Sequence, residues 1–346
     1  MNGLGPLPLT PEFHEKPWGR RSLLPFFADR AELTGEAWFT CEENRVGCGF
    51  FAGTSIGELA DSLGPRLMGR DHRPQSLRRR SADKPRADAP CKPPPYFPVL
   101  SKLLFVDEKL SVQVHPDDTY GLAHEDGPGK TEMWYVAEAR AGAKVALGLT
   151  KVMSGEELAD AARSGQIEKY LNWVPVRQGD VIFVEPGLLH TIGPGVTICE
   201  IQQNSDLTYR FYDFGRVDAA GKPRPLHVDK AVAVIRQEPW PGFIRGESLE
   251  EDGWRRERLV CCPYFAVERV EWGAHKFELD GGRFELLIVL AGCGSIGEIP
   301  YWPGSAFLIP AAAEPFELVA RAPSVALRAY EPRPGEEALF PRPRCD

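Results

Sequence analysis

The sequence predicts a mainly β protein: a barrel of antiparallel strands with a few short helices, followed by a second, smaller all-β domain. Three observations support this fold class. Proline (32 residues) and glycine (34 residues) are both abundant in the 346-residue chain, which favours many short strands and turns over long helices. Short apolar or alternating runs bounded by turn residues recur along the chain. Polar side chains share one face of several runs, as in a barrel with a site in its interior.

Composition and charge limit the class of protein. Hydrophobic residues make up 43% of the chain and charged residues 26%, as in soluble globular proteins. The formal net charge of −8 argues against a nucleic-acid partner. No run approaches the roughly 18 apolar residues of a membrane span, and the first residues lack the basic and apolar regions of a signal peptide. We therefore expect a cytoplasmic protein with neither a nucleic-acid nor a membrane partner.

The N-terminal part contains one abrupt change of composition. A short helix is expected at 56–63. Residues 64–95 are basic, rich in proline and poor in large apolar side chains, which predicts a mobile surface insertion. We divide the chain into a first domain at 1–238, which includes this insertion, and a C-terminal β domain at 239–346.

The stretch at 111–118, Ser-Val-Gln-Val-His-Pro-Asp-Asp, organises the first domain. Successive side chains of a strand point to opposite faces, so Ser111, Gln113 and His115 share one face. Proline and the two aspartates that follow cannot continue a central strand and turn the chain away. A hydroxyl, an amide and an imidazole therefore point into one space.

Two further runs bring polar groups toward the same space. A turn at 127–129 leads into a strand on which Lys130, Glu132 and Trp134 share a face. Residues 179–190 form a turn, a strand and a proline-bounded loop that ends on His190.

The other expected elements complete the two domains. Ser154 and Glu157 have capping-box spacing and begin a helix that runs to about Leu171. A second short helix is expected at 226–235. Further strands of the first domain are expected at 97–106, 144–149, 196–202 and 207–213. Those of the C-terminal domain are expected at 264–270, 284–291, 305–309 and 315–330. The C-terminal strands carry no clustered metal-type side chains, so we expect a structural role for that domain.

Four donors form a candidate metal site. They are two imidazoles, a carboxylate and an amide oxygen, each in or beside an expected strand: Gln113, His115, Glu132 and His190. Such a mixed N/O set suits zinc and also accepts iron, cobalt, nickel or manganese. One such residue alone is more often a core histidine or a surface glutamate, but four that alternate inward predict a site.

The spacing can be compared with the cupin pattern, in which a strand carries His-x-His, a glutamate follows nearby, and a second strand ends in histidine. Here Gln113 replaces the first histidine and Glu132 lies further along the chain. The run from Asp180 to His190 fits the pattern better. We infer a cupin jelly-roll barrel, with a jelly-roll-like C-terminal domain.

Cationic side chains are expected around these donors. Lys102 and Lys130 together with the Ser111 hydroxyl suit a phosphate group. Arg210, in the strand at 207–213, could stabilise negative charge on a metal-bound oxygen. Taken singly, each is better explained as part of a surface salt bridge.

Three long motifs closely resemble type I mannose-6-phosphate isomerases (phosphomannose isomerases) of the short bacterial form. They are Leu-Ser-Val-Gln-Val-His-Pro-Asp-Asp at 110–118, Gly-Lys-Thr-Glu-Met-Trp-Tyr at 129–135, and the run at 203–216 that contains Leu-Thr-Tyr-Arg-Phe-Tyr-Asp. The resemblance covers roughly residues 10 to 335.

The resemblance implies one zinc ion per chain held by the four donors, and a phosphosugar substrate. It also implies that Arg210 is the active-site arginine, that Lys130 has a catalytic role, and that Lys102, Ser111 and Lys130 face the sugar phosphate. A monomer or homodimer is expected. The chain departs from the family in its longer basic segment at 64–95. It also has Gly129 where longer members carry a histidine, so a role of that histidine does not transfer.

The implied reaction interconverts mannose 6-phosphate and fructose 6-phosphate through a cis-enediol. It needs a base, for which Glu200, Asp206 and Lys130 are candidates that the sequence does not separate. Two alternatives stay open at this point. One is another metal cupin, such as a phosphoglucose isomerase or an iron dioxygenase. The other is a non-catalytic cupin that binds sugar phosphates.

Overall fold

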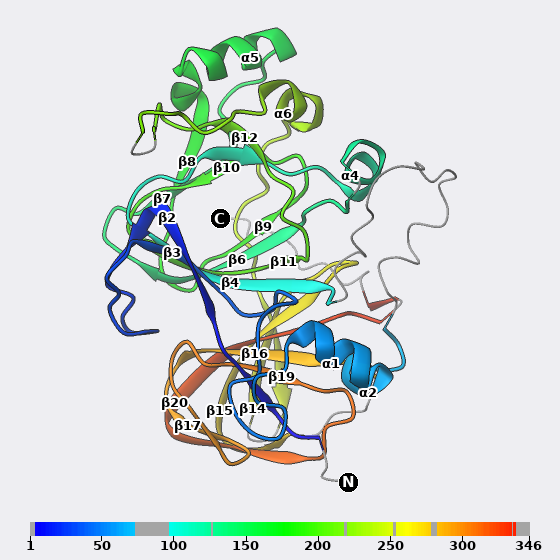
Figure 1. The fold of residues 1–346 in the computed structure, drawn as a ribbon. Helices are drawn as coiled ribbons and strands as arrows, with labels where there is room; N and C mark the ends of the chain where they lie inside the picture. Colours follow the sequence, from blue (N-terminus) through cyan, green and yellow to red (C-terminus); the bar gives the residue numbers. More distant parts are fainter. Residues whose placement is uncertain are drawn as a thin grey trace.

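Three antiparallel sheets stacked in layers make up most of the structure (Figure 1). The structure is a computed structural model that describes residues 4–72, 97–125, 127–217, 220–251, 254–277, 282–333 and 335–336. The predicted mainly β fold class is confirmed. Two of the sheets form the barrel, and the third is built mostly from the C-terminal part of the chain.

The first barrel sheet has five strands. Their order is β12-β5-β10-β7-β8, and all their pairings are antiparallel. The strands are β5 (Val112–Val114), β7 (Lys144–Leu149), β8 (Leu171–Pro175), β10 (His190–Ile192) and β12 (Tyr209–Tyr212).

The second barrel sheet has six strands. Their order is β2-β3-β4-β11-β6-β9, again antiparallel throughout. The strands are β2 (Glu12–Arg20), β3 (Thr34–Trp38), β4 (Val99–Val106), β6 (Glu132–Ala139), β9 (Val181–Val184) and β11 (Val196–Gln203).

The two barrel sheets face each other across a shared apolar core. Leu104, Trp134 and Ile198 enter it from the six-stranded sheet, and Val145 and Leu147 enter it from the five-stranded sheet. Side chains alternate on every strand, so polar residues in phase with these core residues also point into the barrel. This alternation positions the candidate site.

The third sheet has nine strands and packs against the outer face of the six-stranded sheet. A second core joins them, with Phe105 on the barrel side and Phe265 and Phe284 on the other. The strands are β1 (Leu7–Leu9), β13 (Glu247–Glu251), β14 (Trp254–Cys261), β15 (Ala266–Phe277), β16 (Glu285–Ala291), β17 (Gly294–Ile296), β18 (Ile299–Tyr301), β19 (Ala306–Ile309) and β20 (Phe316–Tyr330).

Short helices cover the outer surfaces. α5 and α6 lie over the outer face of the five-stranded sheet, at the top of Figure 1, where they share a third core with Val112 and Val114. None of the helices in the described part of the chain is long and apolar enough to cross a membrane. The helices are α1 (Ile56–Leu63), α2 (Pro65–Met68), α4 (Asp118–His124), α5 (Gly155–Arg163), the 3₁₀ helix η2 (Gln166–Tyr170) and α6 (Val228–Val234).

Two sequence expectations about helices meet different outcomes. The capping box of Ser154 and Glu157 is present, with both reciprocal hydrogen bonds. The expected continuation to Leu171 is wrong, because α5 ends at Arg163 and Gly165 adopts a left-handed φ of 75° before η2. A left-handed residue breaks the helical hydrogen-bond pattern, and glycine adopts it at little cost.

The first residues of the predicted insertion at 64–95 are part of the ordered fold. Residues 65–68 form α2, and Leu67 and Met68 are fully buried against the third sheet. Their carbonyl groups accept hydrogen bonds from the backbone N–H groups of Ala311 and Phe284. The rest of the predicted insertion, 73–95, lies outside the described residues.

The proposed domain boundary at 238/239 needs one amendment. β1 pairs with β19, so residues 7–9 belong to the nine-stranded sheet rather than to the barrel. The barrel itself ends with α6, and the chain then crosses to β13. The division of the remaining residues at 238/239 stays a prediction.

Candidate metal centre

Two cross-strand rows of side chains point into the barrel from the five-stranded sheet and the six-stranded sheet. In the five-stranded sheet, Arg210 pairs with Gln113, which in turn pairs with His190. Directly paired residues of antiparallel strands point to the same face. In the six-stranded sheet, Lys102 pairs with Glu200.

His115, Glu132 and His190 meet in the interior of the barrel. The Nε2 atom of His115 lies 3.3 Å from Glu132 Oε1, and the Nε2 atom of His190 lies 3.8 Å from Glu132 Oε2. One ligand atom of each residue lies within 4.8 Å of those of the other two. All three side chains are buried.

Backbone carbonyl groups fix the orientation of both imidazoles. His115 Nδ1 lies 2.9 Å from the carbonyl oxygen of Leu207, and His190 Nδ1 lies 2.8 Å from that of Leu188. A carbonyl oxygen only accepts hydrogen bonds, so each Nδ1 carries the proton. Each Nε2 atom is then a free lone-pair donor directed at Glu132, as in metal-binding histidines.

The charges of the three groups suit a cation. Burial lowers the pKa of His190 to about 3, with a smaller contribution from His115, so this imidazole is neutral at physiological pH. Burial and then the Lys130 ammonium also lower the pKa of His115. Burial alone raises the pKa of Glu132, but the charge of the Lys130 ammonium outweighs burial and holds that pKa well below its usual value.

These groups fit a bound divalent metal ion. The Nε2 atoms of His115 and His190 are buried, and neither has a hydrogen-bond partner among the described residues. Buried polar atoms without partners cost free energy, which metal coordination removes. Gln113, the fourth predicted donor, faces the same interior beside His190, and its part in coordination stays a proposal.

Two buried lysines compensate two buried carboxylates near the centre. Lys130 Nζ lies 2.5 Å from Glu132 Oε1, and Lys102 Nζ lies 3.6 Å from Glu200 Oε1. Burial and then the charge of Glu132 raise the pKa of Glu200 to about 7. The indole Nε1 of Trp134 lies 3.2 Å from Glu132 and 3.0 Å from Glu200, so it connects both carboxylates.

The predicted arginine and serine lie on the opposite sheet. Ser111 precedes β5 and is buried. Arg210 donates from one terminal nitrogen to the carbonyl oxygen of Pro225 at 2.9 Å, and its Nε is buried without a hydrogen-bond partner among the described residues. Burial and then Arg224 lower the pKa of Arg210 from its usual high value.

Comparison with known proteins identifies the family. The chain is 33% identical to a mannose-6-phosphate isomerase of Bacillus subtilis over 325 residues, which is 90% of this chain and 95% of the relative. It is 34% identical to a mannose-6-phosphate isomerase of Streptococcus mutans over 84% of this chain and 86% of the relative. No family model matches the sequence.

The chain belongs to the mannose-6-phosphate isomerase family. The crystal structure of the Bacillus subtilis mannose 6-phosphate isomerase agrees with this, with a TM-score of 0.79, 30% identity, and coverage of 94% of this chain and 99% of that chain. The resemblance found in the sequence motifs is thereby confirmed.

Close backbone packing requires a glycine at position 129. A Cβ atom at Gly129 would lie 2.4 Å from the backbone carbon of Asp117 and 2.6 Å from the backbone nitrogen of Asp118. No side chain fits that space without a backbone shift.

Two tryptophans are functional candidates to which the sequence assigned no role in the site. Trp134 was placed on the face of Lys130 and Glu132, which was the available signal, but its contact with Glu200 depends on the pairing of β6 with β11. The ring of Trp38, on β3, lies 4.4 Å from Lys102 Nζ. Both contacts depend on which strands are neighbours, β6 with β11 and β3 with β4, and the sequence of one strand does not specify its neighbours.

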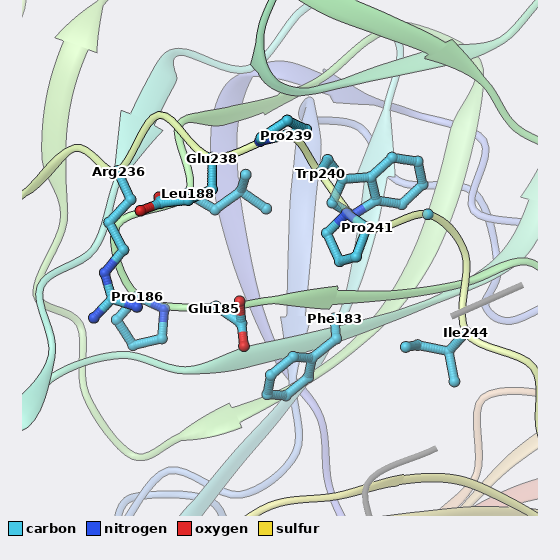
Figure 2. A pocket seen from close by; sticks show the side chains of 11 residues that line it. Phe183, Glu185, Pro186, Leu188, Arg236, Glu238, Pro239, Trp240, Pro241 and Ile244 are labelled. Carbon is cyan, nitrogen blue, oxygen red and sulfur yellow. The ribbon is translucent and has the colours of Figure 1, made fainter. Parts of the chain in front are cut away.

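A cavity lies beside the metal centre rather than at it. This space of about 490 Å³ lies between the loop at 185–188 and the segment at 236–244. Figure 2 shows the side chains that line it, with the ring of Trp240 on one side. None of the predicted metal donors lines it. The loop still contacts the centre, because the N–H of Gly187 donates to the carbonyl oxygen of His115 at 2.8 Å.

Replacing Glu132 by glutamine tests the centre. Glu132→Gln removes the only carboxylate of the cluster, so the metal content after dialysis is expected to fall from about one ion per chain to below about one-tenth. Elemental analysis by mass spectrometry measures this. Glu185→Gln, on the exposed loop before His190, is the matched control and should keep its metal. Full metal content in Glu132→Gln would contradict the claim that the carboxylate of Glu132 holds the ion.

Proposed function

We propose that this chain is a metal-dependent aldose–ketose isomerase that interconverts mannose 6-phosphate and fructose 6-phosphate through a cis-enediol. The observation that carries the proposal is the buried cluster of His115, Glu132 and His190. It lies inside the barrel of a chain that spans 95% of a mannose-6-phosphate isomerase. We further propose that zinc, one ion per chain, is held by this cluster together with Gln113.

The bound ion would supply Lewis-acid stabilisation of negative charge on the sugar oxygens. Arg210 faces the same interior from β12, in the row of Gln113 and His190. We assign it the role of fixed positive charge next to the oxygens of C1 and C2, where the enediolate develops.

Among the candidate bases, the geometry favours Glu200. It is buried, and its pKa of about 7 allows it to accept a proton near neutral pH and return it. The pKa of Lys130 is raised, because Glu132 and Glu200 outweigh the effect of burial, so its ammonium is a poor base. Asp206 is exposed to solvent. Glu200 would take the proton from C2 of mannose 6-phosphate and deliver it to C1.

For the phosphate we propose Lys102, Ser111 and Lys130. Lys102 is 4% exposed, and the carboxylate of Glu200 compensates only one side of its ammonium. Lys130 lies against Glu132, so its ammonium becomes available to the substrate phosphate once Glu132 binds the metal ion.

Because a phosphosugar is retained inside cells by its charge, we expect a cytoplasmic enzyme that acts as a monomer or homodimer.

A coupled assay tests the function. Metal-loaded protein is expected to form fructose 6-phosphate from mannose 6-phosphate, to lose this activity with a chelator, and to regain it on addition of zinc. Turnover that is insensitive to the chelator contradicts a metal-dependent reaction. Oxygen consumption instead of isomerisation would indicate a dioxygenase, and binding of the sugar phosphate without turnover would indicate a non-catalytic cupin.

The role of Glu200 predicts both a mutational and a pH effect. Glu200→Gln should lower kcat by about 10²–10⁴-fold while the metal content is unchanged. In the native chain, kcat/KM should fall as the pH drops, because protonated Glu200 cannot accept the C2 proton. The apparent pKa should be at or below about 7, since a bound cation favours the carboxylate. A kcat of Glu200→Gln within about tenfold of the native value would exclude this base.

Arg210 and Lys130 should differ in which kinetic constant they control. Arg210→Ala should lower kcat by about 10²–10³-fold, because the lost charge acts mainly on the enediolate. Lys130→Ala should raise KM for the phosphosugar by at least about tenfold, because a phosphate contact is lost. Steady-state kinetics on protein of verified metal content measures both. An unchanged KM in Lys130→Ala would remove that lysine from the phosphate site.

A further inference from the structure

Trp38, Lys102 and Glu200 form one cross-strand row in the six-stranded sheet. Trp38 on β3 pairs directly with Lys102 on β4, and Lys102 pairs directly with Glu200 on β11. Directly paired side chains lie on the same face of an antiparallel sheet. The lysine is therefore flanked by a tryptophan on one side and a carboxylate on the other.

The Lys102 ammonium is held by these two neighbours. Its Nζ lies 3.6 Å from Glu200 Oε1 and 4.4 Å from the centre of the Trp38 ring. A lysine side chain has four rotatable bonds and loses considerable entropy when it is fixed. A cation over the face of tryptophan is attracted by the negative potential of the ring, and more strongly where water is excluded.

Trp38 is itself fixed in place. Its Nε1–H donates to Glu36 Oε2 at 2.6 Å, and the ring of His14 lies against it at a centroid distance of 4.4 Å. Burial alone raises the pKa of Glu36, but the charges of Lys102 and Lys16 outweigh it and keep the carboxylate ionised. The indole is thus anchored through its N–H and through the ring of His14.

The position of Trp38 is not explained by core packing. Its neighbours Ala37 and Phe39 point to the other face of the strand and are fully buried in the core beneath the barrel. Trp38 points the opposite way, into the barrel, and is only partly buried. Its ring contacts a charged group and an imidazole there, rather than an apolar cluster.

We propose that Trp38 is a positioning residue: its indole face holds the Lys102 ammonium at the place where that ammonium binds the phosphate of the substrate. Glu36 and His14 hold the indole in turn. This inference rests on the proposed function, because it assumes that Lys102 contacts the phosphosugar. It assigns Trp38 no contact with the substrate.

A double-mutant cycle tests the inference. The variants are Trp38→Leu, Lys102→Met and the double variant, with Trp302→Phe, an exposed tryptophan of the C-terminal sheet, as the matched control. Calorimetry measures the Kd for a hexitol 6-phosphate, which lacks the carbonyl group and cannot isomerise. Assays measure KM and kcat in parallel, and circular dichroism verifies folding.

Trp38→Leu should raise both Kd and KM by about tenfold, and kcat should change by less than about threefold. In the Lys102→Met background the same change should alter Kd by less than about twofold, because the residue that Trp38 positions is already absent. Trp302→Phe should have no effect. An equal increase in Kd in both backgrounds, or no increase in either, overturns the proposal.

A variant of unchanged shape keeps the test valid if Trp38→Leu does not fold. Tetrafluorotryptophan at position 38 retains the indole but removes the negative potential of its face, so it should also raise Kd. An unchanged Kd would exclude the interaction between Lys102 and the ring.

The binding measurement does not require turnover, so it separates this inference from the proposed function. A metal-loaded native chain without isomerase activity would contradict the proposed function, whereas an active chain with an additive cycle would contradict only the role of Trp38.

Discussion

The structure depends on how a carboxylate is kept ionised inside a β barrel. Glu132 is fully buried between two sheets, where an isolated charge costs several kcal/mol. Its surroundings offset that cost with a lysine ammonium and an indole N–H. The unprotonated nitrogens of two buried imidazoles face the same carboxylate and have no partner among the described residues, an arrangement that is costly without a cation. A site for a divalent metal ion accounts for all of it at once.

The two barrel sheets contribute different parts of this site. The five-stranded sheet carries the metal-type donors and Arg210, whereas the six-stranded sheet carries Glu132 together with the lysines and their carboxylate partners. The substrate would therefore be held between a layer that stabilises negative charge and a layer that moves a proton and binds the phosphate. The third sheet and the outer helices contribute apolar cores that hold the barrel sheets in place.

The sequence predicted most of the elements well, and it placed the candidate donors on strands that face one interior, since both follow from local periodicity. Alternation along the strand at 111–115 was enough to place Gln113 and His115 on one face, and the structure directs that face into the barrel. The end of α5 was missed because it depends on the left-handed conformation of Gly165. The order at 64–72 was missed because Leu67 and Met68 gain their burial from strands more than 200 residues away in sequence.

Contacts between strands were not accessible from the sequence. Glu200 could be offered as a base only as one of three candidates, because its raised pKa comes from burial and from Glu132 on another strand. The same holds for Trp38, whose significance depends on its pairing with Lys102. Register between distant strands determines which side chains become neighbours, and single-strand periodicity does not specify it.

Anomalous X-ray diffraction from crystals of the zinc-loaded protein tests the central claim most directly. The account predicts one strong peak per chain inside the barrel, about 2.0–2.2 Å from the Nε2 atoms of His115 and His190 and from an oxygen of Glu132. A peak at any other group of side chains, or no peak within reach of these three atoms, would contradict it.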